Sequence, residues 1–234
     1  MSSQLLRLFH LGLLVAFAFG AVACSIQQEV VLAVEEGASI EVTIPNLEPQ
    51  TSNLSGGLKS QLDIDISFLR ILFGLPLNGT IDVTEILIAG SGFPVIPPFP
   101  LQSTLCQYAD PADPGGGSVS VSLASRQLGI QTTANALIVP VDPIVLSLFG
   151  GEPIPFPVAI DVTAPITLLD LLGVIGGGDL PLSLVQELDF VFESENPLLD
   201  GLTITGELPL STAEAIPDGP LVSECETFLD GFLP

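Results

Sequence analysis

Residues 61–68 read QLDIDISF, so that polar and apolar side chains alternate at every position of this stretch. Successive side chains of an extended strand point to opposite faces, which gives this stretch one apolar face and one polar face. This pattern predicts a β-strand with one face buried and the other in water. The same period of two recurs in six other stretches, at residues 39–44, 79–84, 118–124, 157–163, 188–193 and 202–207.

Turn-forming pieces separate these predicted strands. Residues 94–100 read PVIPPFP and residues 110–117 read DPADPGGG, both of which are typical of turns and loops. Proline has no N–H to donate to a neighbouring strand, so the prolines within 153–157 indicate an edge strand or an extended connection. Many short strands separated by turns predict an antiparallel, sandwich-like arrangement.

Short apolar runs that end in glycine recur along the chain. Residues 68–74 read FLRILFG, residues 144–150 read IVLSLFG, and a looser copy at 168–173 reads LLDLLG. Each run is long enough for about two helical turns, with glycine where a helix commonly ends. A further helix is expected over 221–233, where apolar residues recur at helical spacing. The predicted fold class is all-β or mainly β, with antiparallel sandwich-like sheets and a few short capping helices.

Two of these runs share more than their composition. In both, the short sequence LFG is followed by IDVT a few residues later. The second LFG lies 76 residues after the first (Phe73 to Phe149), and the second IDVT lies 79 residues after the first (Asp82 to Asp161). One interpretation is a domain of two related halves, at about residues 29–125 and 126–234. The other is chance recurrence of short apolar words in a chain rich in Leu and Ile.

The first 23 residues have the layout of a signal peptide. Arg7 precedes an apolar stretch at 11–19, and small residues follow up to Cys24. The apolar stretch is shorter than the roughly 20 residues that a membrane-spanning helix needs. We therefore expect residues 1–23 to be removed and residues 24–234 to form the mature, mainly β domain.

The residues Ala21-Val22-Ala23-Cys24 form a sequence that resembles the lipobox of bacterial lipoproteins, although its first position departs from the usual pattern. The resemblance implies cleavage before Cys24, a lipid on the Cys24 thiol and attachment to the bacterial cell envelope. Ser25 is typical of sorting to the outer membrane or cell surface in lipoproteins of this kind. The same small residues also fit an ordinary A-x-A signal-peptidase site, which would give a secreted protein with an unmodified Cys24.

Cysteine parity agrees with the lipoprotein interpretation. An exported protein lies in an oxidising compartment, where an unpaired thiol is unusual, and lipidation of Cys24 leaves Cys106 and Cys225 as one pair. A disulfide between them closes a loop of about 120 residues, for which the chain-entropy model gives roughly 4–5 kcal/mol of stabilisation. The alternative is two separately buried thiols.

The net charge of the mature chain argues against anionic binding partners. The mature chain keeps three basic residues, Lys59, Arg70 and Arg126, against 27 acidic ones, which gives a formal charge of −24. A field of this sign repels phosphate backbones and anionic lipid surfaces, so it argues against nucleic-acid binding and against electrostatic docking on membranes. We expect the membrane partner to be reached through the lipid on Cys24.

The amino-acid composition of the mature chain also excludes several catalytic mechanisms and metal sites. His10 is the only histidine and lies in the predicted signal peptide, so the mature chain lacks the base of Ser-His-Asp and Cys-His mechanisms and the imidazole ligands of zinc or copper sites. No pair of carboxylates stands out as catalytic. Asp110 and Asp113 are explained more simply by a turn than by a calcium site. We expect no enzymatic activity, no cofactor and no metal.

The apolar runs are the best candidate binding site. Phe73 and Phe149 are expected to line a cavity for an acyl chain, and Arg70 is placed to meet a lipid head group or to pair with an acid. The predicted function is a non-catalytic binding module for lipid or another apolar ligand. The alternative is a structural or adhesive surface protein without a small ligand. An apolar cavity of roughly several hundred Å³ favours the first, and a filled core favours the second.

Overall fold

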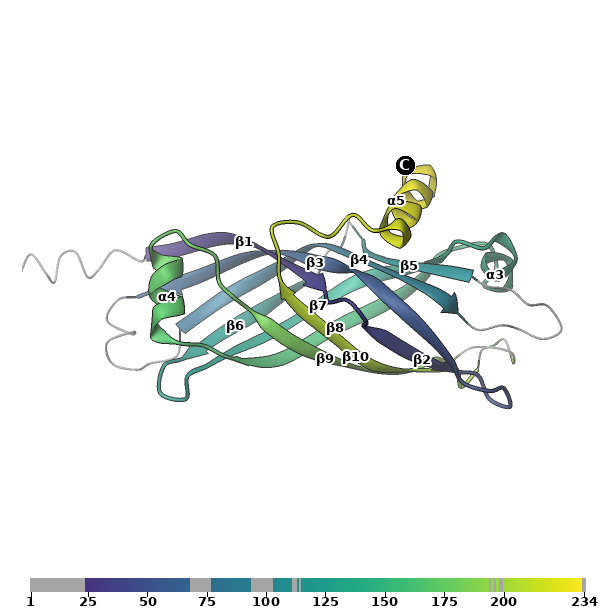
Figure 1. The fold of residues 1–234 in the computed structure, drawn as a ribbon, viewed down its shortest axis with the longest axis horizontal. Helices are drawn as coiled ribbons and strands as arrows, with labels where there is room; N and C mark the ends of the chain where they lie inside the picture. Colours follow the sequence, from purple (N-terminus) through teal and green to yellow (C-terminus); the bar gives the residue numbers. More distant parts are fainter. Residues whose placement is uncertain are drawn as a thin grey trace, which may run out of the picture.

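A computed structural model describes residues 24–67, 77–93, 103–110, 113, 115–193, 195, 197 and 200–232. These residues form ten strands and three short helices, and all strand pairs are antiparallel (Figure 1). The prediction of a mainly β, antiparallel fold with a few short helices is confirmed. The strands are β1 (Cys24–Val34), β2 (Ser39–Thr43), β3 (Gln50–Ile66), β4 (Leu77–Phe93), β5 (Ser103–Ala109), β6 (Gly116–Ser122), β7 (Gln127–Pro140), β8 (Ile154–Pro165), β9 (Ser183–Val191) and β10 (Thr203–Thr212), and the helices are α3 (Pro143–Leu148), α4 (Leu168–Ile175) and α5 (Pro220–Phe232).

The ten strands belong to one sheet built around the long pair β3 and β4. On one side of this pair, β1 and β2 both lie between β3 and β10, and β9 forms the edge. On the other side, β5 and β6 both lie between β4 and β7, and β8 forms the edge. The chain therefore leaves two edge strands, β8 and β9, which α4 connects.

The sheet curls until these two edges approach each other. The ring of Phe156 on β8 packs edge-on against Phe190 of β9, with 4.6 Å between centroids, and it stacks at 5.9 Å on Phe192, just after β9. Among the described residues no backbone ladder joins β8 to β9. We call this unpaired junction of β8 and β9 the seam. The curled sheet encloses one large apolar core.

Helix α5 covers part of the outer face of the sheet. Leu87, Tyr108 and Val139 point outward from β4, β5 and β7 and form a second apolar cluster with Val222 and Leu229 of α5. Figure 1 shows α5 standing outside the curled sheet. Burial under the helix, together with the Asp110 charge, raises the pKa of the Tyr108 phenol above its usual value.

A disulfide between Cys106 of β5 and Cys225 of α5 fastens this helix to the sheet. Their Cα atoms lie 5.5 Å apart, and both side chains are fully buried. The predicted pairing is confirmed. Cys24 is the first residue of β1 and pairs in register with Ile66 of β3.

The predicted boundary between two halves, near residue 125, falls in the turn between β6 and β7. Strands on both sides of it belong to the same sheet. The first copy of the repeated apolar run, at 68–76, lies outside the described residues. The duplication therefore stays a prediction.

Candidate functional site: the apolar interior of the sheet

An apolar cavity of about 150 Å³ lies inside the curled sheet next to α3. We call it the α3 cavity. Its wall includes Val145, Leu148 and Phe149, and Glu193 is the charged residue among the described residues that line it. Strands from both sides of the central pair complete the wall, with Val42 from β2 and Ile138 from β7 among them.

Local sequence fixes α3 against this cavity. The carboxylate of Asp142 caps the helix by accepting hydrogen bonds from the backbone N–H of Ile144 (2.8 Å) and of Val145 (3.2 Å). Gly150, with φ +84°, follows the helix in the left-handed conformation that favours glycine. The predicted short helix with a terminal glycine is therefore present, and it delivers Phe149 to the cavity wall.

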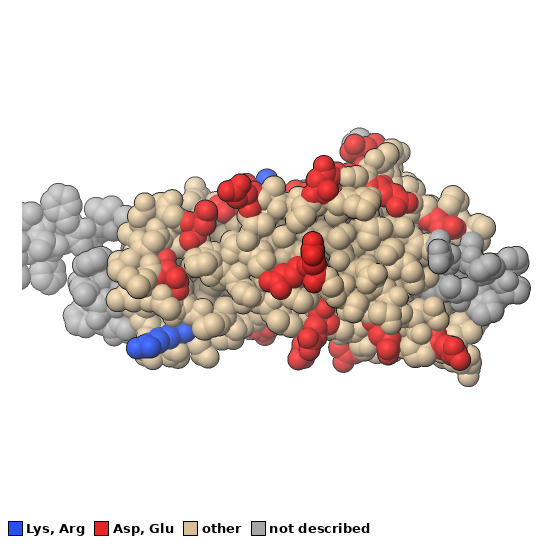
Figure 2. Space-filling model, viewed as in Figure 1, with Lys and Arg blue, Asp and Glu red and all other residues tan. Residues whose placement is uncertain are grey.

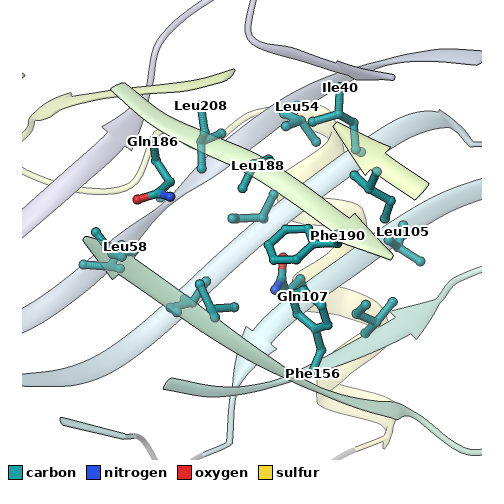
Figure 3. Close-up of a pocket in the computed structure, with 18 of the residues that line it drawn as sticks. Ile40, Leu54, Leu58, Leu105, Gln107, Phe156, Gln186, Leu188, Phe190 and Leu208 are labelled. Carbon is teal, nitrogen blue, oxygen red and sulfur yellow. The ribbon is translucent and has the colours of Figure 1, made fainter. Parts of the chain in front are cut away.

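A second apolar cavity, of about 70 Å³, lies directly behind the seam. We call it the seam cavity. Figure 3 shows Phe156 and Phe190 pointing toward one another across it, with the amide of Gln107 beside them. The two cavities share four wall residues, so they are neighbours within one interior: Phe93, Leu105, Ile138 and Ile204.

One polar atom in the seam cavity wall has no partner. Gln186 of β9 donates a hydrogen bond from Nε2 to the carbonyl of Glu187 (2.7 Å), and its Oε1 is buried without a hydrogen bond. A buried carbonyl oxygen without a donor costs about 1–3 kcal/mol. The atom is therefore available to accept a hydrogen bond from a bound molecule.

Outside the seam lies an open, mainly polar groove of about 520 Å³ between β8 and β9. Asp161, Glu187 and Asp189 line it, whereas Gln186 and Phe190 line both the groove and the seam cavity. Because no ladder crosses the seam, side-chain packing alone separates the groove from the apolar interior.

Cavity size limits what the interior can hold. A dry cavity of about 150 Å³ lined by Leu, Ile and Phe is large enough for benzene or xenon. The α3 cavity has this size and a mostly aliphatic and aromatic lining, in which Ser103 and Glu193 are polar. Pockets for drug-sized ligands are larger, at roughly 300–1,000 Å³. The interior as it stands accommodates a small apolar molecule or one stretch of an acyl chain. It is neither a filled core nor a cavity of roughly several hundred Å³, the volume that would favour a binding module over a structural protein.

The residues predicted for ligand binding divide into two groups. Phe149 is half-buried in the wall of the α3 cavity. Arg70 and Phe73 lie outside the described residues. Sequence reasoning missed Phe156 and Phe190, although the prolines near Phe156 marked its strand as an edge.

The surface carries the strong negative charge seen in the sequence. Figure 2 shows acidic side chains spread over the visible face, with few basic ones among them. Lys59 forms an ion pair with Glu29 (3.3 Å) at an exposed position, where such a pair contributes little stability. Within the described ranges no group of three or more His, Cys, Asp or Glu side chains is placed to hold a metal ion. No helix in those ranges is long and apolar enough to cross a membrane.

No protein-family model, curated protein or solved structure matches this chain. The sequence and the geometry of the interior are therefore the basis for assigning a function.

Proposed function

We propose that this chain is a non-catalytic lipoprotein of the bacterial cell envelope that binds an apolar ligand inside its curled sheet. The lipid on Cys24 holds it at the outer membrane or cell surface. The α3 cavity supports the binding role, because it is an empty apolar space whose wall contains Phe149, a residue selected from the sequence. Well-packed interiors contain few voids larger than a water molecule, so a space of this size distinguishes this interior from a filled core.

The ligand that fits best is uncharged and carries a hydroxyl group. The formal charge of −24 on the mature chain disfavours an anionic head group. Gln186 Oε1 lacks a donor and lies beside the seam cavity, so a ligand hydroxyl can satisfy it. A single-chain neutral lipid meets both conditions, with its chain in the α3 cavity.

Filling the α3 cavity with a larger side chain should weaken binding. Val42 is 1% exposed and lies in the cavity wall, so the ring of Val42→Phe occupies space that the ligand needs. Excluding two methylene groups of the ligand costs about 1.6 kcal/mol, which lowers affinity more than tenfold. Calorimetric titration of the purified protein with a long-chain alcohol such as decanol measures this change.

Val185→Phe is the matched control, since Val185 is 54% exposed on the outer face of β9 and the same substitution adds no volume to either cavity. It should bind decanol like the unchanged protein. Equal binding by Val42→Phe would show that the α3 cavity is not the site. Failure of the unchanged protein to bind decanol or benzene would favour the alternative of a structural or adhesive surface protein.

A further inference from the structure

Helix α4 presents two apolar faces, and only one of them is packed. Leu171 and Val174 are 1% and 3% exposed and face the core. On the neighbouring face, none of the described elements covers four large aliphatic side chains, which are between 43% and 77% exposed. These four residues, which we call the α4 strip, are Leu168, Leu169, Leu172 and Ile175.

The α4 strip belongs to a firmly built helix. The hydroxyl of Thr167 accepts a hydrogen bond from the Asp170 backbone N–H (3.2 Å), while the Asp170 carboxylate accepts one from the Thr167 backbone N–H (2.8 Å). The Thr167 hydroxyl also donates to the Asp170 carboxylate (2.6 Å), and this bond, together with the one from the Thr167 backbone N–H, lowers the pKa of the Asp170 carboxyl. The charge of Asp170 is therefore used to cap the helix. The end is equally defined, since Gly177 adopts φ +86°. The strip is therefore a fixed surface.

The strip lies at the end of the molecule where β1 begins. Figure 1 shows α4 beside the start of β1, whereas α3 lies near the opposite end. Gln28 of β1 donates from Nε2 to the Gly178 carbonyl (3.3 Å) and to Asp179 Oδ1 (3.4 Å), so the loop after α4 is tied to β1 four residues beyond Cys24. A lipid on Cys24 would therefore leave the protein at the end of the molecule that carries α4.

From this placement we infer that α4 lies on the lipid bilayer, with the α4 strip inserted among the lipids beside the anchor. The inference extends the proposed function, from which it takes the lipid on Cys24. An exposed aliphatic face on a helix is the feature with which interfacial helices enter the boundary between head groups and acyl chains. The bilayer should have an uncharged surface, because the strong negative charge of the chain repels anionic lipids.

A second copy of the chain fits the strip less well. Four partly exposed side chains on one eight-residue helix offer far less than the roughly 800 Å² per partner that a stable interface buries. Two chains that each carry a formal charge of −24 also repel one another. A bilayer needs no complementary surface, so it is the occupant that this small patch suits.

The absence of tryptophan from the chain makes the inference directly testable. The Leu169→Trp variant places a unique tryptophan in the strip, and Val191→Trp places one at an exposed apolar position (63%) on β9 as a control. Both variants start at residue 24, where the sheet begins, and carry Cys24→Ser, so that no lipid anchor contributes. Neutral phosphatidylcholine vesicles, with and without brominated acyl chains, are then added.

We expect the emission of Leu169→Trp to shift to shorter wavelength and to be quenched by brominated lipid, and that of Val191→Trp to stay unchanged. Adding Leu172→Glu to the Leu169→Trp variant should weaken vesicle binding about tenfold or more, because a carboxylate resists transfer into lipid. Unchanged Leu169→Trp emission at saturating lipid would overturn the inference. So would a shift that depends on protein concentration and ignores brominated lipid, which would indicate a second copy.

This outcome is independent of the proposed function. The anchor is tested separately by whether Cys24→Ala releases from cell membranes a full chain that also carries Leu172→Glu, in which the α4 contact is weakened. The cavity is tested by decanol in the absence of vesicles. Quenching without release would leave the α4 contact standing and would remove the lipid anchor. Release without quenching would do the reverse.

Discussion

Replacing Cys106 and Cys225 together by alanine is expected to lower the free energy of unfolding by roughly 4 kcal/mol. The bond joins residues 119 positions apart, and in the chain-entropy model a cross-link of this length contributes about 4–5 kcal/mol by restricting the unfolded chain. Both side chains are fully buried, so their truncation adds a packing loss. Urea denaturation of the double variant and of the unchanged protein measures the difference.

Tyr108 reports on α5 in the same variant. It is the only tyrosine in the chain, and burial under α5 raises its pKa. If α5 leaves the sheet, the phenolate regains water and the pKa falls back toward its usual value of about 10. Absorbance titration of the folded double variant follows this change.

Val222→Ala separates the contribution of the Cys106–Cys225 disulfide from that of the packing of α5 on the sheet. Val222 is 2% exposed in the cluster under α5, and its truncation leaves the disulfide in place. We expect the free energy of unfolding to fall by about 1–3 kcal/mol, while the pKa of Tyr108 stays raised because α5 remains on the sheet. An unchanged denaturation midpoint in the double cysteine variant would contradict the stabilising role of the bond.

The strands could be predicted from the sequence where one face of the strand is exposed to solvent. Residues 61–66 of β3 alternate as read because their odd-numbered side chains remain partly exposed. β7 was missed because its buried face carries Thr132, Ala134 and Ala136, whose small or polar side chains give little hydrophobic contrast. β1 was missed because Val30–Val34 are buried on both faces, which removes the alternation. The predicted strands omitted β5 as well, a short strand with the central sequence TLCQY.

Helices α3 and α4 were predicted from apolar runs that end in glycine, and α5 from the helical spacing of its apolar residues. α3 ends before Gly150 as expected, whereas α4 continues through Gly173 to Ile175. Gly173 does not end α4, because the C-terminal turn is provided by Gly176, which directly follows Ile175, and by Gly177. A single glycine inside a helix costs only about 1 kcal/mol, so the apolar contacts of Leu171 and Val174 outweigh it.

The site was less predictable than the fold. Phe149 follows from a local pattern, but the seam depends on which strands occupy the two edges of the sheet, and pairing between distant strands decides that. The prolines of β8 gave the one local signal. Pro155, Pro157 and Pro165 all occupy odd positions, and the absence of an N–H there marks the side of β8 that has no neighbour.

Backbone amides along the seam are expected to alternate in hydrogen exchange, with adjacent residues differing roughly a thousandfold or more. On β8 the even-numbered residues bond to β7, as the bond from Ile166 N–H to the Arg126 carbonyl (3.0 Å) fixes the phase of the ladder. On β9 the even-numbered residues bond to β10, as the bond from Phe192 N–H to the Leu202 carbonyl (2.8 Å) shows. Odd-numbered residues on both strands therefore turn their amides toward the seam.

Exchange measured residue by residue by NMR tests this expectation. Ala159, Asp161 and Thr163 on β8 and Glu187 and Asp189 on β9 should exchange almost as fast as an unfolded chain, since little opening is needed. Their even-numbered neighbours should exchange only through larger openings that approach the global free energy of unfolding. Equal protection of odd and even amides would mean that β8 and β9 pair with each other, which would close the seam.

The geometry of the seam also predicts how a bound ligand changes the hydrogen exchange of the β8 and β9 amides. α4 joins the two unpaired strands, so contact of the α4 strip with a bilayer would bring one end of the seam to the lipid surface. Side chains such as Phe156 and Phe190 are then the barrier between the bilayer and the apolar interior, and their packing can open without breaking a backbone ladder. Decanol bound inside should fill the space behind these rings and make the larger openings of the sheet rarer. The even-numbered amides on β8 and β9 should then exchange more slowly, while the odd-numbered amides should still exchange fast. Slowing of the odd-numbered amides instead would indicate that the ligand draws the two edges into a ladder.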